Sequence, residues 1–241
     1  MRLARAETPD GVVWGEYDDG TVHADGASYA VGTDATLLAP CARTATMYCV
    51  GRNYAATLDQ MDYECPDEPD WFIKPAVSAH PPGEPVVHPP WTDELTYAGE
   101  LAAVVDDTCT DLAPGEVDDA VRGWTIMNDL DALDQSGRTA RKAFDGSGPL
   151  GPWLETDLDP SDLAVETRVG GELRQDASTE LMLFGPRELV AHLSERYTFR
   201  PGDVVAFGSP ANPGLVEPGE AVEITYEGIG TLENTVVAPA D

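Results

Sequence analysis

The sequence predicts a β-rich α+β protein with few helices. Short apolar runs bounded by Gly, Pro, Asp or Asn recur along the chain, as is typical of strands joined by turns. Clear helical spacing of apolar residues is confined to residues 187–195, where Leu189, Val190 and Leu193 share one face. Strands and helices do not alternate in the way that builds a parallel sheet, so a doubly wound α/β fold is not expected.

The first half of the chain predicts two successive β units. Residues 11–15 and 21–23 flank the turn Asp18-Asp19-Gly20, which indicates a hairpin within the first 45 residues. A second unit begins with the apolar run at 47–50. Residues 55–70 are polar and acidic, and we expect a short helical start followed by a mobile loop or lid.

The second half predicts further strands. Residues 96–105 become continuously apolar, so this strand is expected to be buried on both faces at its far end. The remaining predicted elements are a short helix at 114–121, strands at 123–130, 204–207, 221–226 and 230–237, and a hairpin at 163–173 around Gly170-Gly171.

The charge is strongly one-sided. There are 44 acidic residues against 14 Lys and Arg, which gives a formal net charge of -30 and a pI of about 4.1. Such charge repels itself unless salt screens it, so the composition predicts a cytoplasmic protein of a salt-accumulating, halophilic cell. No basic stripe is available for nucleic acid or an anionic membrane surface, and no apolar run approaches the roughly 20 residues that span a bilayer.

Lysine is almost absent from the chain. Its two lysines are Lys74 in Phe-Ile-Lys-Pro and Lys142 in Arg-Lys-Ala-Phe-Asp. Because a compact ammonium and a planar guanidinium are not interchangeable, each lysine is expected to have a role that Arg cannot fill. The alternative is that both are ordinary exposed lysines.

Three carboxylates are candidate metal ligands. Glu100 begins an apolar run, where a charge is costly unless it is paired or bound to a metal. Asp129 and Asp131 follow the apolar stretch 124–127, and on a strand two residues apart they would share one face. Oxygen ligands of this kind suit Mg²⁺ or Mn²⁺. The alternative, acids that are simply solvated in an acid-rich protein, remains open on spacing alone.

Taken in order, several segments resemble the fumarylacetoacetate hydrolase family, including its acylpyruvate hydrolase and oxaloacetate decarboxylase members. The resemblance covers residues 46–241 and leaves 1–45 as a small N-terminal β unit. Its motifs are Val50-Gly51-Arg52-Asn53-Tyr54, Phe72-Ile73-Lys74-Pro75, Tyr97-Ala98-Gly99-Glu100-Leu101-Ala102, Asn128-Asp129, Arg141-Lys142-Ala143-Phe144-Asp145, Gly151-Pro152-Trp153 and Pro201-Gly202-Asp203-Val204-Val205.

The resemblance implies a rolled mixed β-sheet with an active site at its mouth, usually in a homodimer. It implies Mg²⁺ or Mn²⁺ chelating a small 2-oxo or 1,3-dicarbonyl acid and stabilising an enolate, with Lys142 as the catalytic cation beside the oxyanion. By their places in the motifs, the candidate substrate-binding residues are Arg52, Tyr54, Lys74 and Ser209.

The sequence departs from the family pattern at the expected site. The lid His and Glu are replaced by Thr57 and Gln60, neither of which is a general base near neutral pH. The first metal Glu is replaced by Ala98, and the substrate-carboxylate Arg by Leu133. Since Asp131 is gained beside Asp129, we predict a rearranged metal site of Glu100, Asp129 and Asp131.

Two functions follow from this pattern. The first is a divergent metal-dependent enzyme that hydrolyses, decarboxylates or isomerises small 2-oxo or dicarbonyl acids, with hydrolysis disfavoured by the missing His and Glu. The alternative is a catalytically impaired family member that acts as a structural, regulatory or ligand-binding subunit.

Overall fold

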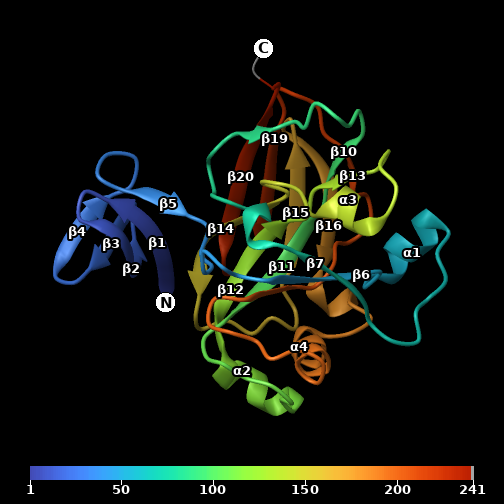
Figure 1. Cartoon of the computed structure of the whole chain (residues 1–241), viewed down its shortest axis with the longest axis horizontal. Coiled ribbons are helices and arrows are strands. Elements are labelled where there is room, and N and C mark those ends of the chain that lie inside the picture. Colours follow the sequence, from blue (N-terminus) through green and yellow to red (C-terminus); the bar gives the residue numbers. More distant parts are fainter. Residues whose placement is uncertain (240–241) are drawn as a thin grey trace.

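The computed structural model describes residues 1–239, and its largest sheet runs through most of the molecule (Figure 1). Within those residues the main path of this sheet has the order β4-β3-β2-β1-β14-β12-β11-β17-β6-β7, with β5 beside β1 and β8 beside β14. Its strands are β1 (Arg2–Thr8), β2 (Gly11–Asp18), β3 (Thr21–Ala24), β4 (Ala27–Ala30), β5 (Thr36–Leu38), β6 (Met47–Gly51), β7 (Asp70–Lys74), β8 (Ala79–His80), β11 (Gly99–Val105), β12 (Val121–Asn128), β14 (Gly148–Glu155) and β17 (Val204–Ala206).

Two smaller sheets complete the β structure. The order β16-β15-β19-β20-β9 joins β9 (Val86–Val87), β15 (Ala164–Val169), β16 (Glu172–Ser178), β19 (Ala221–Tyr226) and β20 (Gly230–Val237). The order β13-β10-β18 joins β10 (Leu95–Tyr97), β13 (Asp131–Ala132) and β18 (Gly214–Leu215). Parallel and antiparallel pairs occur together, for example β17 with β6 and β11 with β12, so the prediction of a mixed, β-rich fold is confirmed.

Helices are short and lie around the sheets (Figure 1). They are α1 (Ala55–Met61), α2 (Val117–Ala120), α3 (Arg138–Lys142) and α4 (Pro186–Ser194), with 3₁₀ turns η1 (Ala76–Ser78), η2 (Pro114–Glu116) and η3 (Thr179–Leu181). The predicted helix at 187–195 is α4, which begins at a proline in its first turn and buries Leu189, Val190 and Leu193 as expected. Among residues 1–239, no helix is long and apolar enough to cross a membrane.

The N-terminal strands have a core of their own. Ala4, Ala6, Val22 and Tyr29 are buried together between β1 to β4, and Figure 1 shows these strands in blue at one end of the molecule. They connect to the remaining strands through β1, which pairs with β14 at Arg2 and Leu3. The predicted division at residue 45 stays a prediction, and the last two residues of its second unit, 240 and 241, lie outside the described residues.

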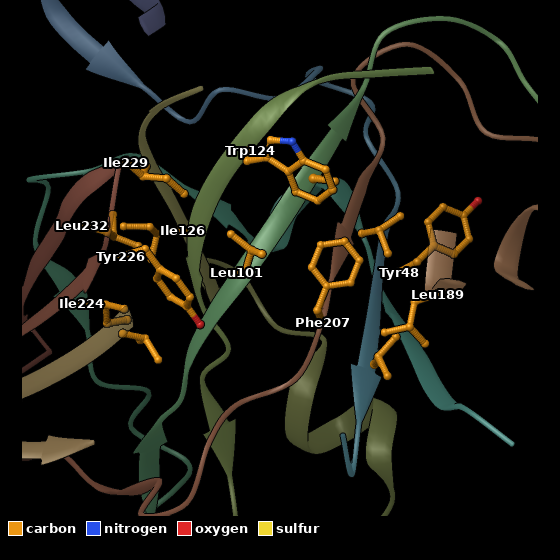
Figure 2. Close-up of a cluster of buried hydrophobic side chains, with 14 of the residues drawn as sticks. Tyr48, Leu101, Trp124, Ile126, Leu189, Phe207, Ile224, Tyr226, Ile229 and Leu232 are labelled. Carbon is orange, nitrogen blue, oxygen red and sulfur yellow. The ribbon is translucent and has the colours of Figure 1, made fainter. Parts of the chain in front are cut away.

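The main core lies between the large sheet and the five-stranded sheet (Figure 2). Leu101, Ile126 and Phe207 point into it, and the rings of Trp124 and Phe207 pack with their centroids 5.9 Å apart. Full burial of each such side chain contributes about 1.5–3 kcal/mol, which fixes β11, β12 and the segment after β17 relative to one another. The candidate site is built at the ends of these strands.

Candidate active site

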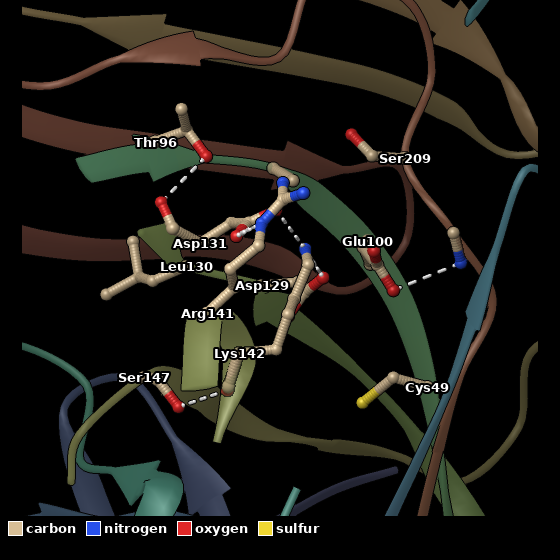
Figure 3. A network of polar contacts seen from close by, with 12 residues as sticks. Cys49, Thr96, Glu100, Asp129, Leu130, Asp131, Arg141, Lys142, Ser147 and Ser209 are labelled. Atoms are coloured by element: carbon tan, nitrogen blue, oxygen red, sulfur yellow. Dashed lines mark hydrogen bonds and ion pairs between the residues drawn. The ribbon is translucent and has the colours of Figure 1, made fainter. Parts of the chain in front are cut away.

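A pocket opens where α1, α3, β10–β11 and the turn after β17 meet. Its cavity volume is about 540 Å³, and its wall includes Glu100, Asp129, Asp131, Lys142 and Ser209. Residues far apart in the sequence therefore meet at one point, as Figure 3 shows. Glu100, Asp129, Lys142 and Ser209 were expected here from the resemblance, and Asp131 from its place beside Asp129; all five line this pocket.

Asp129 is held between the two lysines of the chain. The Nζ atom of Lys142 donates to Oδ2 at 2.5 Å, and the Nζ atom of Lys74 lies 2.9 Å from Oδ1 as an ion pair outside hydrogen-bond geometry. Asp129 is almost fully buried. Burial disfavours its ionised form, but the two ammonium groups outweigh that cost and hold the pKa of Asp129 below its ordinary value. The Asp129 carboxylate is therefore charged at neutral pH.

Lys74 is fully buried on β7 and does not line the pocket. Its ammonium donates to the carbonyl oxygens of Leu130, Lys142 and Ser147 and to the Ser147 hydroxyl. A buried ammonium is stable only with such a shell of acceptors. Lys74 thus ties the ends of β12, α3 and β14 together, so its position does not support the predicted direct contact with substrate.

Asp131 is committed to a basic side chain of α3. The Arg141 guanidinium donates from Nε to Oδ1 at 2.8 Å and from Nη2 to Oδ2 at 2.6 Å, while Lys142 Nζ lies 3.3 Å from Oδ2. Asp129 and Asp131 do not belong to one strand, because β12 ends at Asn128 and Asp131 begins β13. The expectation of a shared strand face is corrected in this respect: both carboxylates reach the pocket, but Lys142 is what joins them.

Burial acts differently on Glu100, the second residue of β11. Its Oε2 accepts the backbone N–H of Gly208 at 3.0 Å, and Oε1 has no hydrogen bond among the described residues. Gly208 has φ +87°, and a Cβ there would lie 3.0 Å from Cβ of Asn53, so this turn requires glycine. Burial first, and the Asp129 charge second, raise the pKa of Glu100 to about 8.

Lys142 faces the pocket with 17% of its side chain exposed. Burial lowers its pKa, but Asp129 and Asp131 more than compensate, so its pKa is raised and it stays an ammonium. An ammonium has three N–H donors, and the two aspartates engage at most two of them. One donor of Lys142 is therefore free for an anionic oxygen in the pocket.

Ser209 and the segment after it are fixed from two sides. The Gln175 amide donates to Ser209 Oγ at 2.8 Å and to the Pro210 carbonyl at 2.9 Å. From the α1 side, Thr57 Oγ1 donates to the Ser209 carbonyl at 3.1 Å, and Gln60 Oε1 accepts the Asn212 N–H at 2.7 Å. The residues that replace the expected lid His and Glu therefore connect α1 to the turn.

The other predicted substrate-binding residues separate into two groups. Arg52 and Ser209 line the pocket. Tyr54 does not: it is 2% exposed, and burial raises its pKa, with the Glu100 charge adding to that effect. Tyr54 is therefore buried behind the pocket wall near Glu100, and its position does not support the predicted contact with a ligand.

Sequence reasoning assigned no role to two arginines that line the pocket. Arg138 and Arg141 lie three apart on α3, and Arg138 donates to both oxygens of Asp70 at 2.7 Å. Arg141 Nη1 has no hydrogen bond within residues 1–239. A signal was available, because Arg138, Arg141 and Lys142 concentrate basic charge within five residues of an acidic chain.

The predicted Mg²⁺ or Mn²⁺ can be tested against the donor set. Glu100, Asp129 and Asp131 line one pocket, but both oxygens of each aspartate already face a cation. Among residues 1–239, no three His, Cys, Asp or Glu side chains are grouped so as to hold a metal ion. As arranged, these residues do not fit a divalent ion, which needs carboxylate oxygens that are not already paired with an ammonium or a guanidinium group.

Comparison with known proteins identifies one family model and several relatives of this chain. The family model described as "Fumarylacetoacetate (FAA) hydrolase C-terminal" matches residues 46–237. Oxaloacetate tautomerase YisK of Bacillus subtilis is 36% identical over 205 residues, covering 78% of this chain and 68% of that protein.

Solved structures agree in fold along the whole chain. The 5-carboxymethyl-2-hydroxymuconate delta-isomerase of Mycobacterium smegmatis superimposes with a TM-score of 0.91 at 38% identity, with 100% of both chains covered. Fumarylpyruvate hydrolase of Pseudomonas aeruginosa, solved in complex with Mn²⁺ and pyruvate, gives a TM-score of 0.78 at 27% identity, covering 93% of this chain and 99% of that one.

Proposed function

The chain belongs to the fumarylacetoacetate hydrolase family, and from that membership we propose that it is an isomerase-type enzyme that interconverts the keto and enol forms of a small 2-oxo acid. The observation that carries this proposal is the pairing, in one pocket, of an ammonium with a free donor and a carboxylate with a free oxygen, Lys142 and Glu100. Relatives named as a tautomerase and an isomerase support the same class.

The residues suit proton transfer next to a carbonyl group. The 2-oxo oxygen would accept the free N–H of Lys142. In its ionised form, which its pKa of about 8 makes the major form only above that pH, Glu100 would take a proton from the neighbouring carbon through Oε1. The C–H electron pair would form the C=C bond as the carbonyl oxygen becomes an oxyanion. Return of that proton to the oxygen completes the enol, so atoms and charge balance without another reactant.

Side chains of α3 and of the turn after β17 would bind the substrate. Arg141 keeps Asp131 with Nε and Nη2, so Nη1 remains for the substrate carboxylate. Ser209 also lines the pocket, apart from Arg141 in Figure 3, and its Oγ would accept or donate a further hydrogen bond to the substrate. This arrangement replaces the arginine that the family pattern places at Leu133.

Hydrolysis is disfavoured because the residues at the expected lid positions, Thr57 and Gln60, do not include a general base. Thr57 and Gln60 are engaged with the turn at 209–212, and neither side chain activates water near neutral pH. Decarboxylation would use the same enolate and is the second reaction to test. It differs from tautomerisation because it releases CO₂ and forms pyruvate from oxaloacetate.

The experiment is a tautomerase assay on oxaloacetate in molar KCl, read as the decay of enol absorbance, with pyruvate and CO₂ measured in parallel. We expect Glu100→Gln to slow the reaction about 10²–10⁴-fold. Lys142→Met should slow it about 10²–10³-fold. Arg168→Gln changes a basic side chain that does not line the pocket and donates to Glu166, so this matched control should leave the rate unchanged. Equal rates for Glu100→Gln and wild type would contradict the proposal.

A second candidate function is a catalytically impaired subunit that binds small acids without converting them. It is favoured by the use of Thr57 and Gln60 as structural contacts rather than as catalytic groups. Oxalate binding with no turnover of any tested 2-oxo acid would support it. The homodimer and the cytoplasmic location expected from the sequence stay predictions, and light scattering on the purified protein tests the first.

A further inference from the structure

The positive charge of the pocket is supplied by side chains. We propose that this pocket is a metal-independent anion site, in which the Lys142 ammonium takes the place that a divalent ion would occupy between the carboxylates. The expected ligand is of the same class as in the proposed function. It is a small carboxylate with a second oxygen nearby, so that two of its oxygens can accept hydrogen bonds in the pocket. This inference rests on the proposed function only for the choice of ligand class, because the experiments below measure binding and not turnover.

The positive charges already outnumber the negative ones. With its pKa raised to about 8, Glu100 is mostly neutral near pH 7, so Asp129 and Asp131 supply two negative charges against the three positive charges of Lys74, Lys142 and Arg141. A divalent ion would add two positive charges beside an ammonium that contacts Asp129 at 2.5 Å. At such short range and away from bulk water, repulsion between like charges costs several kcal/mol, so Lys142 and the ion compete for one place.

The oxygen count points the same way. Arg141 takes both oxygens of Asp131, and the two lysines take both oxygens of Asp129. Gly208 takes one oxygen of Glu100. The remaining free carboxylate oxygen in this set is Glu100 Oε1, so a divalent ion could use an aspartate oxygen here only by displacing a lysine or Arg141 from it.

Ala98 is where the pocket lacks a carboxylate. It lies between β10 and β11, lines the same pocket as Glu100, and its carbonyl oxygen accepts the backbone N–H of Asp129 at 2.9 Å. A side chain at position 98 therefore starts next to both Glu100 and Asp129. Ala98→Glu would add an uncommitted carboxylate beside Glu100 at this point, and with it a further negative charge for a metal ion to neutralise.

The first experiment measures Mn²⁺ binding by the loss of the free-ion electron paramagnetic resonance signal, in 2 M KCl to suppress binding to surface acids. Wild type and the uncharged control Ala98→Gln should show no saturable site below about 1 mM, whereas Ala98→Glu should bind at least about tenfold more tightly. A saturable wild-type site that Glu100→Gln abolishes would overturn the proposal. If Ala98→Glu does not fold, the wild-type titration with its Glu100→Gln control still decides.

The second experiment uses oxalate as the probe. Calorimetric titration of wild type should give the same affinity with EDTA as with Mn²⁺, and Lys142→Met should weaken binding at least about tenfold in both. Arg168→Gln should bind as wild type does. Oxalate binding that appears only with added Mn²⁺ would overturn the metal-independent site. If this experiment succeeds while the tautomerase assay fails, the anion site stands and the proposed reaction falls.

Discussion

Lys74 and Lys142 approach opposite oxygens of the same carboxylate, Oδ1 and Oδ2 of Asp129, at 2.9 and 2.5 Å. One ammonium is fully buried behind the carboxylate and the other faces the pocket. The two lysines of a lysine-poor chain therefore form one unit, in which Lys74 positions the backbone and Asp129, and Asp129 in turn holds Lys142 toward a ligand.

Lys74→Met should be among the most destabilising single changes in this protein. It removes one of the two counter-ions of the buried Asp129 carboxylate and leaves carbonyl oxygens of three segments without this donor, at a cost of about 3–5 kcal/mol. Lys142→Met should cost less, because Lys142 is partly exposed and donates to fewer groups. Urea unfolding of both variants in molar KCl measures the difference, and equal stability of Lys74→Met and wild type would refute the positioning role.

Glu100 gives a pH dependence with a definite sign. Its folded-state pKa is raised to about 8, so between its ordinary value and about 8 the folded protein holds a proton that the unfolded chain releases. Stability supplied by this protonated group is present at low pH and is lost as pH rises through that window. Glu100→Gln mimics the protonated form and keeps the Gly208 hydrogen bond. The variant should therefore not lose stability as the pH rises through this window.

Thermal unfolding of wild type and Glu100→Gln at pH 5 and pH 8 tests this sign. The two melting temperatures should be similar at pH 5, and the variant should be more stable at pH 8 by up to about 1.4 kcal/mol for each unit of pKa shift. For a domain of this size, 1 kcal/mol corresponds to about 2–4 °C. A variant that is less stable at pH 8 would mean that the charged form of Glu100 is the stabilised one.

The strands of the site were predictable because local pattern and burial agree. The continuous apolar run from Leu101 to Val105 is buried throughout, as its composition indicates. The expected strand over 96–105 is interrupted at Ala98, where β10 and β11 join different sheets. This break changes the direction of the chain at the pocket wall. It arises because β10 pairs with β13 and β11 pairs with β12, and such long-range pairing cannot be predicted from a local sequence pattern.

The site residues were identified by motif, but their partners were not. Lys74 is bound by carbonyl oxygens from residues 130, 142 and 147, and a backbone acceptor has no sequence signature. The pairing of Asp131 with Arg141 likewise follows from α3 folding back over β13. It changes Asp131 from a candidate metal ligand into the partner of an arginine.

Salt should stabilise the protein through its net charge of -30. Raising KCl from 0.2 to 2 M shortens the screening length to a few ångströms and reduces repulsion among surface carboxylates. We expect a gain of about 2 kcal/mol, or about 4–8 °C in melting temperature, at pH 7.5. At pH 4, where many carboxylates are protonated, the gain should be much smaller. An equal gain at both pH values would indicate a general salt effect unrelated to charge.

Thr57 and Gln60 should hold α1 against the turn at 209–212. Their two hydrogen bonds, 3.1 Å to the Ser209 carbonyl and 2.7 Å from the Asn212 N–H, each contribute about 0.5–1.5 kcal/mol. The double variant Thr57→Val, Gln60→Ala should therefore open α1 more often, with amide hydrogen exchange in residues 55–61 faster by about 5–30-fold.

Asp59→Asn is the matched control for this contact, because Asp59 lies on the same helix and is exposed without a side-chain hydrogen bond in the described residues. Its exchange rates should equal those of wild type. Faster exchange confined to 55–61 and 209–212 would show that the two replaced lid positions now fasten the pocket wall. Unchanged exchange in the double variant would show instead that burial of Leu58 alone keeps α1 in place.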